Sequence, residues 1–160
     1  MYRRIVVPLD GSALAEQALP QAEGLARLTG APLHLVWVID PAGAGTLGTV
    51  VLHTDALALQ LLLEEERIAA RDYLERIEQD MGDRQQAVTV EYRQGPAADE
   101  LLAVTQPGDL LVMATHGRGG MARWVLGSVA EAVIRRAAVP VLLIRATPLS
   151  PDMSAGDASE

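Results

Sequence analysis

The residues best suited to chemistry lie in a glycine-rich segment. Residues 114–120 read ATHGRGG, and Gly127-Ser128 follows shortly after. Glycines have no Cβ, so their backbone N–H groups can approach an anion closely. Gly127 also stands at the expected start of a helix, where unpaired N–H groups and the helix dipole favour negative charge. We therefore expect this segment to hold the phosphates of a nucleotide such as ATP.

Backbone contacts alone would bind a phosphate weakly. A helix dipole contributes only about 0.3–1 kcal/mol at an exposed site, whereas micromolar affinity requires about 8 kcal/mol. A base such as adenine must therefore be buried as well. The apolar strand ends at Val38 and Met113 are candidate walls for that base.

A second candidate lies at the end of the first apolar run, where Pro8 and Leu9 lead to Asp10, Gly11 and Ser12. Aspartate and serine are common in turns and helix caps, which is one interpretation of this segment. The other is that Asp10 contacts a ribose or a metal-bound phosphate. The two interpretations are compatible, because a capping segment can also line a site.

Other polar side chains have simpler interpretations beside the functional ones. Ser128 and Glu131 have the spacing of a capping box, in which the serine hydroxyl caps the helix of the empty protein. His116 could donate a hydrogen bond to a phosphate, whereas His34 is expected to be a surface or partly buried side chain of a strand. We predict no catalytic residue, because no general base and no pair of metal ligands stands near the glycine-rich segment.

Composition excludes several classes of protein. The chain has no cysteine, and its 13 basic residues are all arginine. A Walker P-loop needs a lysine on the phosphates and a Schiff-base enzyme needs a reactive amine, so neither class fits. The net charge of −8 argues against non-specific nucleic-acid binding. No apolar run has the roughly 18 residues of a membrane span, so we expect a cytoplasmic protein that binds neither nucleic acid nor membrane.

Strand-like and helix-like segments alternate and would position these candidates. Apolar runs predict strands at residues 5–9, 33–39, 87–92, 109–114 and 139–144. Amphipathic spacing predicts a helix that opens at Ser12, contains Pro20 and stops at Gly30, and further helices near residues 57–81, 96–105 and 128–137. The alternation predicts an α/β fold with a doubly wound parallel sheet and helices on both faces, whose ligand binds beyond the carboxyl ends of the strands.

Composition also suggests where the folded domain ends. Residues 1–145 are expected to form one nucleotide-binding domain. Residues 146–160 are mostly Pro, Ser, Ala, Gly and acidic residues, and we expect a disordered acidic tail there, because such a segment cannot bury enough apolar surface to become ordered.

Three landmarks resemble the universal stress protein family, and the resemblance extends over residues 2–145. They are residues 5–12 (IVVPLDGS), the strand end at residues 38–40 (VID), and residues 113–129. ATP-binding members of this family carry Gly, two residues, Gly, nine residues and then Gly-Ser or Gly-Thr. Gly117, a nine-residue gap and Gly127-Ser128 fit that pattern, while Ala114 replaces the first glycine.

The resemblance implies a five-stranded sheet of order 3-2-1-4-5, a pocket for ATP, with or without Mg²⁺, where the strand order reverses, and a homodimer. The dimer would form through the last strand, which begins at Val139 and ends at Ile144. The positions matching the family's nucleotide site are Pro8, Asp10, Val38, Met113, Ala114, His116, Gly117, Gly127, Ser128 and Val129. Because Ala114 adds a methyl group where the backbone approaches the ligand, we expect binding that is retained but weakened.

Three functions remain open on this basis. The first is a regulatory ATP-binding stress protein that hydrolyses ATP slowly or not at all. The second is a nucleotide hydrolase or nucleotidyl transferase, although the His-x-Gly-His signature of such transferases is absent. The third is a nucleotide-free dimeric interaction module, in which Ala114 marks a lost site.

Overall fold

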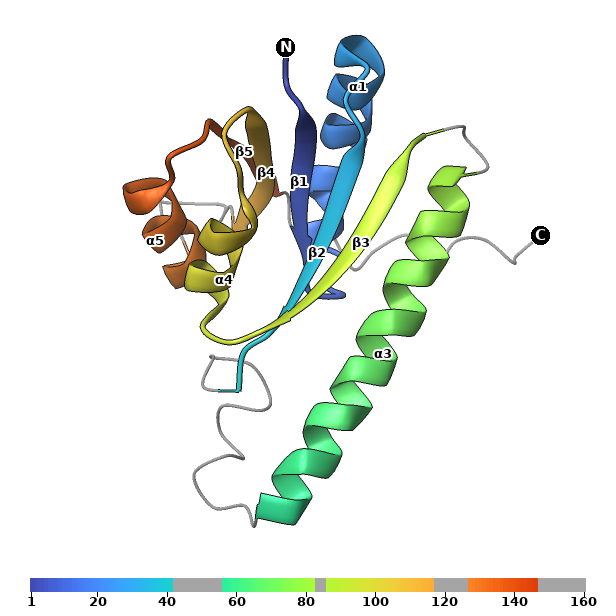
Figure 1. The fold of residues 1–160 in the computed structure, drawn as a ribbon, viewed down its shortest axis with the longest axis vertical. Helices are drawn as coiled ribbons and strands as arrows, with labels where there is room; N and C mark the ends of the chain where they lie inside the picture. Colours follow the sequence, from blue (N-terminus) through green and yellow to red (C-terminus); the bar gives the residue numbers. More distant parts are fainter. Residues whose placement is uncertain (42–55, 83–85, 117–126, 147–160) are drawn as a thin grey trace, which may run out of the picture.

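The computed structural model describes residues 1–41, 56–82, 86–116 and 127–146. These residues form one parallel sheet with the strand order β3-β2-β1-β4-β5 (Figure 1). The strands are β1 (Arg4–Leu9), β2 (Leu33–Ile39), β3 (Val88–Gln94), β4 (Asp109–His116) and β5 (Val141–Ala146). The predicted doubly wound α/β fold and its strand order are confirmed.

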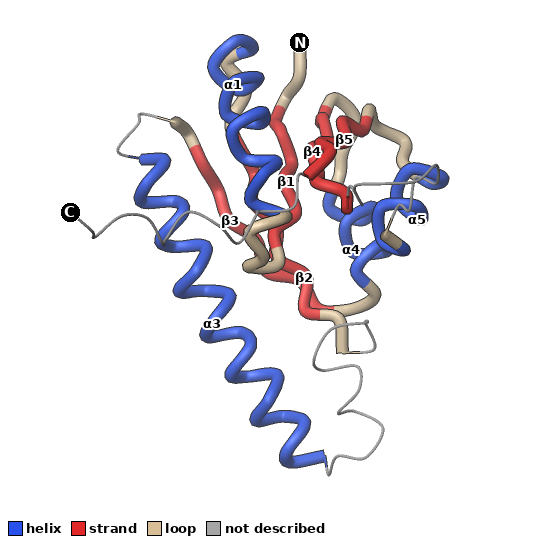
Figure 2. The backbone as a smooth tube through the Cα atoms, turned by 180° about the vertical axis from the view of Figure 1, so that it is seen from behind, coloured by secondary structure: helices blue, strands red, loops and turns tan. Residues whose placement is uncertain are grey.

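Helices cover both faces of the sheet, as Figures 1 and 2 show from opposite sides. They are the 3₁₀ segment η1 (Ala15–Ala18), α1 (Leu19–Thr29), α3 (Ala56–Gly82), α4 (Ala97–Val104) and α5 (Ser128–Arg136). Buried side chains of η1, α1 and α3 pack on one face of the sheet, and those of α4 and α5 pack on the other.

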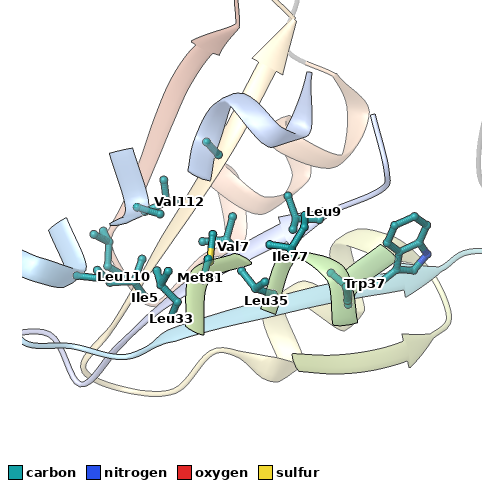
Figure 3. Packing of buried hydrophobic residues seen from close by; sticks show 14 of the residues in the cluster. Ile5, Val7, Leu9, Leu33, Leu35, Trp37, Ile77, Met81, Leu110 and Val112 are labelled. Atoms are coloured by element: carbon teal, nitrogen blue, oxygen red, sulfur yellow. The ribbon is translucent and has the colours of Figure 1, made fainter. Parts of the chain in front are cut away.

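Each strand contributes side chains to both faces of the sheet, because successive side chains point in opposite directions. In β1, Ile5, Val7 and Leu9 face η1, α1 and α3, whereas Val6 faces α4 and α5. Figure 3 shows the first of these two clusters, which extends along the strands as far as Trp37. A parallel sheet covered on both faces requires such continuous apolar runs.

The first helix differs from its prediction. The hydroxyl Oγ of Ser12 does accept a hydrogen bond from the Ala15 N–H at 3.0 Å, but only the short 3₁₀ segment η1 follows. The α-helix itself begins at Leu19, with Pro20 in its first turn, and ends at Gly30 as expected. Proline has no N–H to donate, so it fits the first turn of a helix and does not fit its interior.

The last strand begins two residues later than predicted. Val139 and Pro140 precede β5, and the Pro140 carbonyl accepts a hydrogen bond from the Leu111 N–H at 3.0 Å. Pro140 lacks an N–H donor, but its carbonyl still accepts a hydrogen bond from the neighbouring strand β4. β5 lies at one edge of the sheet, where a nearby proline is tolerated.

Helix α3 is longer than the sheet it packs on. Figure 1 shows its N-terminal half running past the carboxyl ends of β2 and β3. Leu57 and Leu61 in that half are 64% and 60% exposed, whereas Leu74 and Ile77 further along are buried. Among the described residues, no helix is both long enough and apolar enough to cross a membrane.

Candidate functional site

The strand order reverses between β1 and β4, and these two strands separate toward their carboxyl ends. β1 stays paired with β2 as far as Leu9, but it is paired with β4 only as far as Val6. The carboxyl ends at such a reversal are where doubly wound folds bind their ligands.

Pro8 accounts for this separation. The Ile5 N–H donates to the Pro32 carbonyl on the β2 side at 2.9 Å. Donors alternate in direction along a strand, so those of Val6 and of position 8 point toward β4. Proline has no N–H, so β1 has no donor for β4 just where their pairing ends. Pro8 therefore keeps the backbone edges apart at the predicted ligand position.

Asp10 lies directly after β1, in an exposed tight turn. Its Oδ1 accepts a hydrogen bond from the Ser12 N–H at 3.0 Å. Gly11 between them has a φ of 76°, a left-handed conformation that glycine adopts without strain. The predicted turn function of Asp10 is thus present, and it holds the carboxylate beside the end of β1.

The end of β2 is tied to the α4 side of the sheet. Val38 packs against the cluster that α4 and α5 cover. Two residues later, Asp40 accepts a hydrogen bond from the Ala97 N–H at 2.9 Å and so satisfies a donor in the first turn of α4.

Three of the predicted site residues share one apolar cluster. Met113 is buried in the cluster under α4 and α5, and Val38 and Val129 pack against it. Ala114 instead packs against the cluster on the other face. The methyl group of Ala114 therefore faces away from the side on which Val38 and Met113 lie.

The start of α5 contradicts the predicted capping box. Gly127 is the N-cap residue, and no described side chain caps the helix. Ser128 is therefore the first helical residue and is exposed, while Glu131 lies one position too far along to reach back. The Glu131 carboxylate instead pairs with Arg135 at 2.7 Å. The first-turn N–H groups consequently have no side-chain acceptor among the described residues.

His34 is more deeply buried than the surface or partly buried position expected for it, since it is only 6% exposed. Its Nδ1 lies 2.8 Å from Thr89 Oγ1 and its Nε2 lies 2.9 Å from Glu91 Oε2. Burial lowers the pKa of His34 from its ordinary value of 6.5, and the nearby Arg4 charge lowers it further, against the opposing effect of Glu91. We assign His34 a structural role between β2 and β3.

The glycine-rich part of the predicted site is only partly covered by the described residues. His116 ends β4 opposite Ala146, while Gly117 and residues 118–126 lie outside the described residues. Within the described ranges, no group of three or more His, Cys, Asp or Glu side chains could hold a metal ion.

Trp37 is not among the predicted site residues, but strand pairing places it opposite Leu9 and next to the Asp10 turn. A Cβ built on Gly11 would lie 2.9 Å from Cη2 of the Trp37 ring. No spacing in the sequence links these two positions, because the strand register alone brings them together.

Comparison with known proteins identifies the family. The family model described as "Universal stress protein family" matches residues 1–145. A universal stress protein of Methanocaldococcus jannaschii is 31% identical over 150 residues, covering 91% of this chain and 83% of that protein.

Solved structures agree with this result. A universal stress protein from Lactobacillus plantarum superposes with a TM-score of 0.72 at 25% identity, covering 90% of this chain and 98% of that one. A universal stress protein from Archaeoglobus fulgidus in complex with dAMP has a TM-score of 0.58 at 23% identity, covering 89% of this chain and 97% of that one. The solved structures share the fold, and the family model with the 31% identical relative shows the family: this chain belongs to the universal stress protein family.

Proposed function

We propose that this protein binds an adenine nucleotide such as ATP, with or without Mg²⁺, at the carboxyl ends of β1 and β4. Its function would be regulatory, in the stress response of the cytoplasm, with slow hydrolysis or none. The observation that carries the proposal is the start of α5, whose first-turn N–H groups have no side-chain cap among the described residues. Such a helix start binds phosphate through its N–H groups and its dipole.

The neighbouring residues suit the remainder of a nucleotide. Val38, Met113 and Val129 offer apolar surface on one face of the sheet, as an adenine ring requires. Asp10 supplies a carboxylate at the end of β1, suited to a ribose hydroxyl. The family member from Archaeoglobus fulgidus, in complex with dAMP, supports the same class of ligand.

The described residues favour binding over catalysis. The proposed groups are backbone N–H donors, apolar side chains and a carboxylate whose Oδ1 accepts the Ser12 N–H, all suited to holding a nucleotide. We therefore propose no general base among them. The regulatory signal would come from the bound nucleotide and not from its turnover.

A glycine substitution tests the site without disturbing the fold. Gly127 has an ordinary φ of −62°, and a Cβ there meets no described atom within 4 Å. Gly127→Val should therefore stay folded while its side chain obstructs the phosphates, lowering ATP affinity at least tenfold, which is about 1.4 kcal/mol. Gly24→Val is the matched control, because Gly24 in α1 has equally open space.

Isothermal titration calorimetry with ATP and AMP measures both variants. We expect loss of affinity in Gly127→Val and no change in Gly24→Val. Equal affinity in the two variants would remove α5 from the site. An absence of binding by the wild type would reject the nucleotide proposal and favour the nucleotide-free interaction module.

We also propose that β5 forms a homodimer by pairing with β5 of a second copy. β5 lies at the edge of the sheet, and Val141, Leu142, Leu143 and Ile144 are all half-buried. The carbonyl of Pro140 points toward β4, so by alternation the N–H of Leu143 points outward. An outward row of donors is what a second strand pairs with.

The alternation provides a matched pair of proline variants. Leu143→Pro removes an outward donor, so the variant should have the mass of a monomer in sedimentation equilibrium. Its secondary structure should remain native. Leu142→Pro removes a donor that faces β4 and should destabilise the fold itself. A Leu143→Pro protein of unchanged mass in solution would exclude β5 as the dimer edge.

A further inference from the structure

The ring of Trp37 supports the turn that carries Asp10. Trp37 is 8% exposed and faces η1, α1 and α3. A Cβ on Gly11 would lie 2.9 Å from Cη2 and 3.5 Å from Cζ3 of the indole. The backbone of the turn thus lies directly against the six-membered ring. Figure 3 shows Trp37 at one end of the apolar cluster, beyond Leu9 and Ile77.

Other side chains hold the Trp37 ring in place. The Tyr73 ring of α3 meets it edge to face, with centroids 5.4 Å apart and planes at 65°. The Tyr73 hydroxyl donates to Glu16 Oε1 of η1 at 2.9 Å. The Arg76 guanidinium lies over the Tyr73 ring, with its Cζ 5.4 Å from the ring centroid. Trp37 is therefore fixed by α3, which is in turn tied to η1, the segment that follows the Asp10 turn.

The Tyr73 hydroxyl is a stable donor to Glu16. Burial is the main cause of a raised pKa of Tyr73, and the bond to Glu16 raises it further. The hydroxyl consequently keeps its proton and remains a donor.

Two hydrogen bonds within the turn fix the side chains of Asp10 and Ser12 relative to its backbone. Asp10 Oδ1 accepts from the Ser12 N–H, and Ser12 Oγ accepts from the Ala15 N–H, both at 3.0 Å. The first of these bonds is exposed and the second is partly buried, so the turn also needs a rigid base beneath it to keep them formed. The contact between Gly11 and Trp37 is such a base, since it leaves the turn no room to settle inward.

We propose that Trp37 is a positioning residue for Asp10: its ring sets where the Asp10 carboxylate stands beside the nucleotide at the end of β1. This inference rests on the proposed nucleotide site. It adds to that site a residue, Trp37, on the face of the sheet opposite to Val38 and Met113. Trp37 would touch no ligand and would act only through Gly11 and the Asp10 turn.

A double-mutant cycle separates positioning from general destabilisation. Trp37→Leu should weaken ATP binding about tenfold, the size expected when a hydrogen bond to a charged group is lost. In an Asp10→Ala background the same substitution should weaken binding less than twofold, because the group it positions is gone. Trp37→Phe should restore much of the affinity, since it keeps a ring against Gly11 and Tyr73.

Met81→Ala serves as the control for lost stability. Met81 is buried in the same cluster on α3, two helical turns beyond Tyr73. It should lower the melting temperature without changing ATP affinity. Equal losses of affinity from Trp37→Leu in the wild-type and Asp10→Ala backgrounds would overturn the proposal.

Amide hydrogen exchange gives a readout that needs no ligand. After correction for the difference in global stability, Trp37→Leu should accelerate amide exchange at Ser12 and Ala15 more than Met81→Ala does. Unchanged rates at these two amides would also overturn the proposal. If the wild type binds no nucleotide, the proposed function fails, and these exchange rates alone decide whether Trp37 positions the turn.

Discussion

Gly11→Ala should destabilise the protein by about 2–5 kcal/mol, an unusual loss for the addition of one methyl group. Two contributions add. A non-glycine residue at the Gly11 φ of 76° costs about 1–2 kcal/mol. The new Cβ would also lie 2.9 Å from Trp37 Cη2, and forcing an extra carbon into such packing costs about 1–3 kcal/mol.

Two other glycines separate these contributions. Gly30 has a φ of 70° but open space, so Gly30→Ala should show only the conformational cost of about 1–2 kcal/mol. Gly24 lies in α1 with open space and no positive φ, so Gly24→Ala should stabilise by about 0.4–1 kcal/mol. The expected order of stability is Gly24→Ala, wild type, Gly30→Ala and then Gly11→Ala.

Urea unfolding measures all three, with equal m-values required for the comparison. Each kcal/mol should shift the melting temperature by about 2–4 °C in a chain of this size. The double variant Gly11→Ala, Trp37→Leu should cost less than the sum of the two single substitutions, because removing the ring removes the clash. If Gly11→Ala costs no more than Gly30→Ala, the packing of Trp37 against the turn is refuted.

Other contacts give predictions of equal clarity. The Asp109 side chain is 2% exposed and pairs with Arg4 at 2.9 Å, so Asp109→Ala should cost about 3–5 kcal/mol in urea unfolding. Burial lowers the pKa of His34 below its ordinary 6.5, so the unfolded state binds the proton first and stability falls as pH drops below about 6.5. His34→Gln should flatten that fall between pH 7.5 and 5.5. Asp40→Ala removes the acceptor of the Ala97 N–H and should cost about 1 kcal/mol by thermal unfolding.

The fold follows from sequence patterns because its strands are buried on both faces. Runs such as residues 5–9 and 33–39 are almost wholly apolar, which in a chain alternating with helices indicates a parallel sheet. Errors lie at prolines. Pro20 and Pro140 are predicted inside elements, whereas Pro20 lies in the first turn of α1 and Pro140 precedes β5. At these positions the missing N–H of proline leaves no hydrogen-bond acceptor without its donor.

The site follows from sequence only in part. Val38, Met113 and Val129 do gather on one face. The alternation of side chains can be read directly for Val38 and Met113, which lie in strands, and Val129 reaches the same face from α5. The roles of Pro8 and Trp37 depend on which strand neighbours which. A single sequence does not contain that register, so the separation of β1 from β4 and the contact beneath Gly11 became visible only with the sheet assembled.

Ser128 shows how a local pattern can be correct in spacing and wrong in structure. A capping Ser128 would lose about 0.5–2 kcal/mol of stability on substitution by alanine. With Gly127 as N-cap and Ser128 exposed, Ser128→Ala should instead change the stability of the empty protein by less than about 0.5 kcal/mol. No described side chain accepts from the first-turn donors. Under the proposed function these donors and the Ser128 hydroxyl bind a phosphate, so the same variant should bind ATP more weakly. Thermal unfolding with and without ATP measures both effects, and a loss of stability confined to the empty protein would restore the capping box and weaken the case for α5 as the phosphate site.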